Sequence, residues 1–342
     1  MERQWIIQKT FLGLYRWYVA ESQKKRGWNA DLDFDGGQFR SHHSEEAWKV
    51  MQGFFAFEQY VPDYVSPITQ LVRQCHSRSY FHLQWGAEEA KHSRAWADAL
   101  IFFRHRTCVW MEEYRRDLMC NEWTLSWDDQ LHMFVYTVFQ EWATRLDYRN
   151  FGLLARGTEA YPIADPILER VCSTLVTNGA AHYHFFLDGV RLYLYYFSSE
   201  TLEAVLDVLR HFTMPAQNIV PGWNQVAEAI YRIGIYGPHK FRKGVVEVIF
   251  ANLSLVVRRS MEAGLKASRL VPKESGTLHS TAIWETCAPA QVESHVLRLI
   301  SRIQRYQHRV GQDAIEPWEF VPDPQWPRRQ IGVVGGDDLR VQ

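Results

Sequence analysis

The chain has 342 residues, of which 46% are hydrophobic, 14% aromatic and 23% charged, a composition that can bury a large core and excludes disorder for most of its length. Its 38 Lys and Arg nearly balance 39 Asp and Glu, which gives a net charge of −1 and argues against a nucleic-acid partner. Any charged partner must therefore meet a local patch.

Neither a membrane span nor a secretory signal is expected. The most apolar stretches are residues 192–197, which are too few, and residues 245–257, which polar residues interrupt. No small-residue cleavage site follows an apolar region near the first residue, so a cytoplasmic location is expected. The five cysteines are widely spaced and form no C-x-x-C pair, which predicts mostly buried thiols rather than disulfides or a zinc site.

Apolar residues three and four positions apart dominate from Gln4 to about Arg309, which predicts an all-α fold. In chain order, helices are expected at about 4–25, 45–73, 77–104, 127–157, 166–197, 201–213, 223–235, 240–265 and 290–312. Residues 29–43 and 273–279 have turn chemistry and are expected to be surface loops. We expect one domain over residues 1–322, followed by a mobile tail at 323–342.

Local signals mark several helix ends. Ser44 can cap the second helix, and Asp165 before Pro166 is typical of an N-cap followed by proline at the first helical position. Pro62 and Pro67 are expected to kink the second helix rather than end it, because the heptad spacing continues through the first of them.

Acidic and histidine residues interrupt the apolar stripe of each long helix. The inward positions, spaced alternately four and three residues apart, include Glu58, Glu89, His92, Glu141 and His182. Carboxylates in an apolar layer are normally neutralised, paired or bound to a cation, so this set suggests a metal. The order Glu, Glu-x-x-His, Glu, x-x-x-His is that of four-helix sites for paired iron or manganese ions, which oxygen and nitrogen donors suit.

A purely structural explanation of these residues is also open. One Glu-x-x-His match among 14 histidines is about what chance gives. Glu58 and Glu141 can pair with arginines at a helix surface, and a buried histidine is more often a hydrogen-bonded core residue than a ligand. Spacing by itself leaves both explanations open.

A set of short stretches occurs in order along residues 44–322. The stretches are Phe57-Glu58, Glu88-Glu89-Ala90-Lys91-His92, Phe139-Gln140-Glu141-Trp142-Ala143-Thr144, Thr213-Met214-Pro215-Ala216, Val226-Ala227, Ile235-Tyr236, Arg302-Ile303-Gln304-Arg305 and Pro317-Trp318. Together they resemble the soluble acyl-acyl-carrier-protein desaturases, a di-iron family. The resemblance implies a ferritin-like four-helix bundle core with additional packed helices.

The same resemblance implies a site and partners. By it, Glu58, Glu89, His92, Glu141 and His182 correspond to metal ligands. Thr144 matches the family's catalytic hydroxyl residue beside the oxygen-binding face, although a helix threonine can also simply bond back to a carbonyl. The family uses two Fe ions, dioxygen as co-substrate, a ferredoxin-type electron donor and a homodimer, and it desaturates an acyl chain in a bent apolar tunnel.

The chain departs from the family pattern at one metal-ligand position. The family's second Glu-x-x-His becomes Gly179-Ala180-Ala181-His182, and Asn178 stands where an Asp usually precedes that Glu. A bridging carboxylate is therefore missing, and so is the residue expected to orient a metal-bound imidazole. Since glycine inside a helix costs about 1 kcal/mol relative to alanine, Gly179 does not serve helix stability. Water, a small anion, a substrate carboxylate or Asn178 can fill the space, beside one metal ion or two.

Three functions follow. The first is an oxygen-dependent di-iron oxidoreductase of the acyl-acyl-carrier-protein desaturase type, acting in fatty acid metabolism on a chain carried by acyl carrier protein or coenzyme A; residues 213–216 favour it. The second is hydroxylation or N-oxygenation of a specialised metabolite at an altered metal site, which Gly179 favours. The third is a catalytically degenerate scaffold that binds a carrier protein or a second subunit.

Two further sets of residues bear on these functions. Candidates for the tunnel wall, each of which can equally be ordinary core, are Phe54, Phe55, Trp96, Phe134, Phe185 and Phe186. Candidates for a basic patch that meets an acidic carrier protein are Lys24-Lys25-Arg26, Arg115-Arg116, Arg258-Arg259 and Arg328-Arg329.

Overall fold

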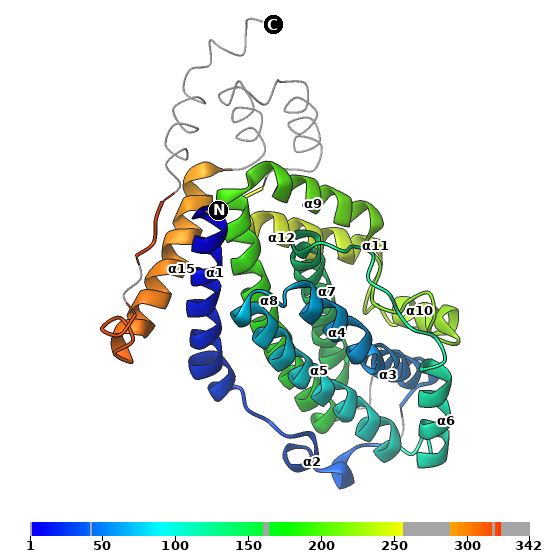
Figure 1. Ribbon diagram of the computed structural model, residues 1–342. Coiled ribbons are helices and arrows are strands. Elements are labelled where there is room, and N and C mark those ends of the chain that lie inside the picture. Colours follow the sequence, from blue (N-terminus) through cyan, green and yellow to red (C-terminus); the bar gives the residue numbers. More distant parts are fainter. Residues whose placement is uncertain (1, 42, 160–163, 256–287, 317–318, 323–342) are drawn as a thin grey trace, which may run out of the picture.

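The computed structural model describes residues 2–41, 43–159, 164–255, 288–316 and 319–322. Within these ranges no strand occurs, and the all-α prediction is confirmed (Figure 1). The α-helices are α1 (Glu2–Trp17), α2 (Ala30–Asp33), α3 (Glu45–Phe57), α4 (Val61–Leu71), α5 (His76–Phe102), α6 (Cys108–Leu118), α7 (Gln130–Ala155), α8 (Pro166–Tyr196), α9 (Ser198–His211), α10 (Trp223–Arg232), α11 (Pro238–Lys240), α12 (Glu247–Asn252) and α15 (Pro289–Arg309). None of these helices is apolar enough over sufficient length to cross a membrane.

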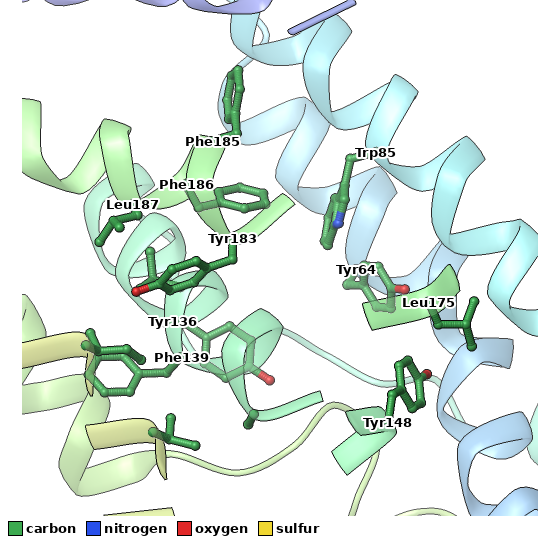
Figure 2. Packing of buried hydrophobic residues seen from close by; sticks show 14 of the residues in the cluster. Tyr64, Trp85, Tyr136, Phe139, Tyr148, Leu175, Tyr183, Phe185, Phe186 and Leu187 are labelled. Carbon is green, nitrogen blue, oxygen red and sulfur yellow. The ribbon is translucent and has the colours of Figure 1, made fainter. Parts of the chain in front are cut away.

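Four long segments form a bundle, which is the ferritin-like core that was expected. They are α3 continued by α4, then α5, α7 and α8, and the pair α7 and α8 makes the most extensive contact (Figure 1). Helices α1 and α15 pack against α8, α10 packs against α3, and α9 packs against both α7 and α8. Figure 2 shows Trp85 of α5 and Phe186 of α8 among the aromatic side chains of the interior, and their ring centroids are 5.4 Å apart.

The predicted helix caps are present. The Ser44 hydroxyl accepts a hydrogen bond from the backbone N–H of Ala47 at 3.2 Å. The Asp165 carboxylate accepts from the backbone N–H groups of the first turn of α8, where Pro166 occupies the first position. Asp165 is fully buried and also binds His43 at 3.1 Å, so this one residue both starts α8 and holds the segment that precedes α3.

The second predicted helix does not end at Pro62, but a 3₁₀ turn interrupts it just before that proline, so the expected kink is a break within one helical segment. Helix α3 stops at Phe57, a 3₁₀ turn occupies Glu58–Tyr60, and α4 begins at Val61 with Pro62 in its first turn. Proline has no N–H to donate to the carbonyl four residues earlier, which is that of Glu58. Pro67 lies inside α4. Glu58 therefore stands at a break between two helices, where the chain is reoriented.

Other elements also differ from the sequence prediction. Helix α6 was not predicted, although its buried residues Met111, Tyr114 and Leu118 have helical spacing. The expected loop at 29–43 contains α2 and a 3₁₀ turn at Gly36–Gln38. The predicted helix at 240–265 is described only to residue 255, as α11, a π-helical segment and α12. The loop at 273–279 and the tail at 323–342 lie outside the described residues.

The cysteines only partly follow the prediction of mostly buried thiols. Cys75 and Cys172 are buried, whereas Cys108 and Cys120 are exposed at the two ends of α6. Cys287 lies outside the described residues. The prediction is wrong for the two exposed thiols because they flank the helix that the sequence pattern did not reveal.

Candidate metal centre

The five ligands predicted from the sequence meet in the interior of the bundle. Glu58, Glu89 and His92 form one group, and Glu89, Glu141 and His182 form a second. In each group the ligand atoms lie within 4.8 Å of one another, and all five residues are buried. Glu89 belongs to both groups, so its carboxylate can bridge two ions. Helical spacing on three helices and the break after α3 produce this convergence.

The two histidines face the carboxylates closely. His92 Nδ1 lies 2.9 Å from Glu89 Oε2 and 3.6 Å from Glu58 Oε1. His182 Nδ1 lies 2.7 Å from Glu89 Oε1 and 3.6 Å from Glu141 Oε2.

These short contacts lack hydrogen-bond geometry. Among the described residues, His92 Nδ1, His182 Nδ1 and Glu89 Oε1 have no hydrogen-bond partner. Buried polar atoms are nearly always hydrogen-bonded, so this cluster of orphaned atoms needs another explanation. Donor atoms that converge without bonding one another fit metal ligation, and carboxylate oxygen with imidazole nitrogen suits iron or manganese. The explanation of His92 as a hydrogen-bonded core histidine does not hold.

Two glutamates are held by aromatic residues rather than by surface arginines. Trp85 Nε1 donates to Glu141 Oε1 at 2.7 Å, and the Tyr148 hydroxyl donates to Glu58 Oε1. Both glutamates are buried, at 3% and 6% exposure. Their pairing with arginines at a helix surface is therefore wrong. In each carboxylate, Oε2 stays free of these bonds and can serve as a ligand.

Burial and mutual charge set the protonation of the cluster. Burial, reinforced by the Glu89 carboxylate, raises the pKa of Glu141 to about 7. Burial also raises the pKa of Glu58. Burial opposes charge on His92, but the Glu89 and Glu58 carboxylates outweigh it and raise the His92 pKa to about 10. In the absence of a metal, Glu141, Glu58 and His92 therefore favour their protonated forms, and metal binding would displace these protons.

Glu88 orients His182, and sequence reasoning did not assign it this role. Its Oε2 lies 2.9 Å from His182 Nε2 and accepts from Asn178 Nδ2 at 2.8 Å. Arg26 and Tyr18 also donate to this oxygen, each at 3.1 Å. Burial opposes ionisation of Glu88, but His182 and Arg26 outweigh it and hold the pKa at about 2. A carboxylate that orients the imidazole is therefore present, but it comes from α5 rather than from residue 178.

Glu88→Ala is expected to weaken binding of Fe(II) about 10- to 100-fold, because the imidazole of His182 loses the partner that fixes its orientation. Glu88→Gln, which keeps an acceptor oxygen, is the matched variant and should lose less affinity. The measurement is the Fe(II) dissociation constant from competition with a chelator, with circular dichroism to establish that each variant is folded. Equal affinity in the wild type and Glu88→Ala would contradict this role for Glu88.

The backbone at Gly179 has room for a side chain. A Cβ atom there would meet Arg145 Cβ and Glu141 Oε2 at 3.7 Å each, which is ordinary contact. Such a side chain would start beside a ligand carboxylate. Asn178 does not fill this space, since its amide bonds Glu88 and the Trp28 indole. The suggestion that Asn178 replaces the missing ligand is therefore wrong.

A cavity of about 480 Å³ adjoins the centre. Glu58 and Tyr148 form its wall nearest to the cluster, and Thr144 lies on the same wall. Most of the remaining wall is apolar or aromatic, with Phe54, Phe57, Ile230, Trp223 and Phe241 among its residues.

Only part of the predicted tunnel wall lines this cavity. Of the six aromatic candidates, Phe54 does, while Phe55, Trp96, Phe134, Phe185 and Phe186 are buried core residues. Thr213, Met214 and Pro215 of the predicted Thr-Met-Pro-Ala stretch do line it. Sequence periodicity could not separate the two cases, because a core side chain and a cavity-lining side chain follow the same helical spacing.

The hydroxyl of Thr144 makes a different hydrogen bond from the hydroxyl of Thr137 on the same helix. Thr144 Oγ1 accepts from Gln140 Nε2 at 3.2 Å and faces the cavity. Thr137, two turns earlier, donates to the carbonyl of Met133 at 2.7 Å. Among the described contacts, no such back-bond is made by Thr144, so the helix-threonine explanation applies to Thr137 and not to Thr144.

One basic candidate is not available to a partner. Arg26 is turned inward, with only 10% of its side chain exposed, and pairs with Glu88. The Lys24-Lys25-Arg26 patch is therefore reduced to its two lysines, which are exposed. Arg115 donates to Gln59 and Arg116 is exposed. The remaining pairs, Arg258-Arg259 and Arg328-Arg329, lie outside the described residues.

Residues 41–269 match the sequence model described as fatty acid desaturase, a range that covers most of the chain and all five candidate ligands. The chain belongs to this fatty acid desaturase family. A Mycobacterium tuberculosis protein named as an acyl-[acyl-carrier-protein] desaturase, DesA1, is 26% identical over 163 residues, which are 45% of this chain and 46% of the relative. Stearoyl-[acyl-carrier-protein] 9-desaturase 6 of Arabidopsis thaliana, a chloroplastic protein, is 27% identical over 140 residues, which are 40% and 34% of the two chains.

This desaturase-family chain thus spans less than half the length of these curated relatives in alignment. Among solved structures, that of DesA2 of Mycobacterium tuberculosis, described as an acyl-ACP desaturase, aligns with a TM-score of 0.48 at 19% identity. The alignment covers 71% of this chain and 94% of that one.

Proposed function

We propose that this protein is an oxygen-dependent di-iron oxidoreductase that introduces a double bond into an acyl chain held by a carrier. The observation that carries the proposal is the shared wall: Glu58 belongs to the metal centre and also lines the cavity. A chain in that cavity lies next to the centre, between aromatic side chains. Family membership supports the same chemistry.

The proposed reaction removes two hydrogens from neighbouring methylene groups. Two C–H bonds break and a carbon–carbon double bond forms, while dioxygen takes up these two hydrogens, two electrons and two protons to give two molecules of water. The electrons come from a ferredoxin-type donor. When bound, the two irons supply the activation of dioxygen and the abstraction of hydrogen.

The protein's own residues hold the substrate and the histidine ligand in place and hold or pass a proton. The apolar wall excludes water and holds the chain beside Glu58. The Thr144 hydroxyl, which faces the cavity from the turn after Glu141, can hold or pass a proton there. Glu88 keeps the imidazole of His182 oriented toward the centre.

The carrier and the assembly are part of the same proposal. The names of the relatives support acyl carrier protein as the carrier, with coenzyme A as the other possibility. A homodimer, a ferredoxin-type donor and a cytoplasmic location are proposed from the family resemblance. Of the basic candidates predicted from the sequence, Lys24, Lys25 and Arg116 are the described residues that are exposed, and we propose that they meet an acidic carrier.

A second reaction is favoured by Gly179. Where the resemblance places a carboxylate, this chain has room for a Cβ atom beside Glu141, and a substrate group could use that space if the metals were bound. Hydroxylation or N-oxygenation would transfer one oxygen atom to the substrate and release one molecule of water, with the same two electrons and two protons.

The test uses the full chain loaded with Fe(II), reduced ferredoxin, dioxygen and a series of saturated acyl groups on acyl carrier protein. Mass spectrometry of the acyl group distinguishes loss of two hydrogens, which is expected, from gain of an oxygen atom. Thr144→Val should lower turnover, while Thr137→Val, its matched control on the same helix, should not. Iron binding without any change of the acyl groups would refute the desaturase assignment.

A further inference from the structure

A buried carboxyl group lies in the cavity wall away from the metal centre. Asp147 of α7 lines the cavity and is only 8% exposed. Its Oδ1 has no hydrogen-bond partner among the described residues. The side chain is not a ligand of either metal group, and the proposed desaturation gives it no task. A buried polar atom of this kind calls for a partner that enters the site.

Helix geometry places Asp147 along the path of a bound chain. At 100° and 1.5 Å per residue, Gln140, Thr144 and Asp147 share one flank of α7, and all three line the cavity. Asp147 lies about 9 Å beyond Glu141 along the helix axis. A substrate whose reacting carbons lie beside Glu58 and Thr144 reaches Asp147 a few atoms further along if it extends in this direction through the same cavity.

The surroundings of Asp147 favour the neutral carboxyl, which both donates and accepts hydrogen bonds. Burial raises its pKa well above the usual range, and only Lys240 opposes this. The Lys240 ammonium donates to the carbonyl of Gly234 and is exposed, so it does not satisfy the acid. Tyr236, the other titratable neighbour, has its own pKa raised by burial and by Asp147.

A plain alkyl chain matches the apolar part of this wall but not Asp147. It would leave the Asp147 oxygen unpaired against methylene groups or would displace a water that paired with it, and either loses affinity. A group with a polar hydrogen and a lone pair satisfies the acid. We propose that Asp147 is a specificity-determining residue, and that the cavity takes a chain bearing a hydroxyl or amino group that hydrogen-bonds its carboxyl. This inference rests on the proposed function only in taking the cavity as the substrate pocket.

The test measures binding rather than turnover. The full-length protein is titrated by calorimetry with octan-1-ol, octylamine and 1-fluorooctane, three probes of similar length. Wild type is expected to bind the alcohol or the amine about tenfold more tightly than the fluoroalkane. Whichever of the two binds more tightly identifies the hydroxyl or the amine as the recognised group. Binding of 1-fluorooctane alone reports whether the cavity accepts a chain, and so tests the pocket separately from Asp147.

Substitutions test whether Asp147 causes the preference for the alcohol or the amine over the fluoroalkane. Asp147→Leu should lose the tenfold preference, and Asp147→Asn, which keeps a donor and an acceptor, should retain a preference for the alcohol. Gln217→Leu is the matched control: it changes another polar residue of the wall, whose amide oxygen already accepts from the backbone of Met214 at 3.2 Å, and should leave the preference unchanged.

Several results would overturn the proposal. They are equal affinity of wild type for the three probes, a preference that persists in Asp147→Leu, and failure of all three probes to bind. If Asp147→Leu does not fold, the wild-type comparison and Asp147→Asn still decide.

Discussion

Glu89→Ala is expected to abolish binding of both metal ions, which is the largest effect of any single substitution at the centre. Glu89 is the one residue that belongs to both ligand groups, so its loss leaves each ion with two protein ligands. The measurement is iron per chain by elemental analysis after anaerobic equilibration with Fe(II). Circular dichroism is the control for folding, because removal of this carboxylate relieves repulsion on Glu58 and Glu141 but also takes a charge partner from the two buried histidines.

Two further variants test whether the loss of iron is specific to Glu89. Glu58→Ala touches only the group formed with Glu89 and His92, so it should retain one ion per chain. Glu112→Ala removes an exposed glutamate of α6 and should bind iron as the wild type does. A Glu89→Ala protein that is folded and still binds two irons would show that the two groups do not share a bridging carboxylate.

Gly179→Glu is expected to tighten iron binding by about tenfold or more, equivalent to about 1.4 kcal/mol. The glutamate would start 3.7 Å from Glu141 Oε2, in a space that a Cβ enters without displacing any neighbour, and would add the carboxylate that the family resemblance implies at this position. Iron stoichiometry and Mössbauer spectra of the oxygen-exposed protein give the measurement, with a coupled iron pair as the expected signal.

Gly179→Ala separates the ligand effect from the helix effect. Alanine fits the same space and should raise the free energy of unfolding by about 1 kcal/mol, because glycine is unfavourable inside a helix. It should leave iron binding unchanged. If the alanine and glutamate variants bind iron equally tightly, residue 179 does not supply a metal ligand. The missing carboxylate then has no effect on the iron affinity of the wild type.

The sequence predicted the bundle and its ligands because both depend on local periodicity. Glu89 and His92 are one turn apart on α5, and Glu141 and His182 occupy the inward positions of α7 and α8. A helix brings such positions to one face whatever the rest of the fold does. The absence of a carboxylate at Gly179 was recognised from the resemblance to the desaturase family and not from periodicity.

The tertiary structure decided the features that join distant segments. Glu88 lies outside the predicted stripe, about 100° around the helix from Glu89, and meets Arg26 and Asn178, which come from other parts of the chain. The break after Glu58 depends on how Pro62 is accommodated, and the cavity wall mixes residues of α3, α7 and α10.

Asp147 shows most clearly what helical periodicity in the sequence cannot predict. Its place in the sequence, one residue before Tyr148 on a long helix, does not distinguish a surface carboxylate from one buried in a cavity wall. Periodicity specifies which residues share a face of a helix, and it is local. What that face meets is settled by packing between helices, which depends on the shapes of side chains far apart in the sequence. The sequence by itself therefore determined which acids and histidines share the inward faces of the helices, and only the tertiary structure decided that they meet and what surrounds them.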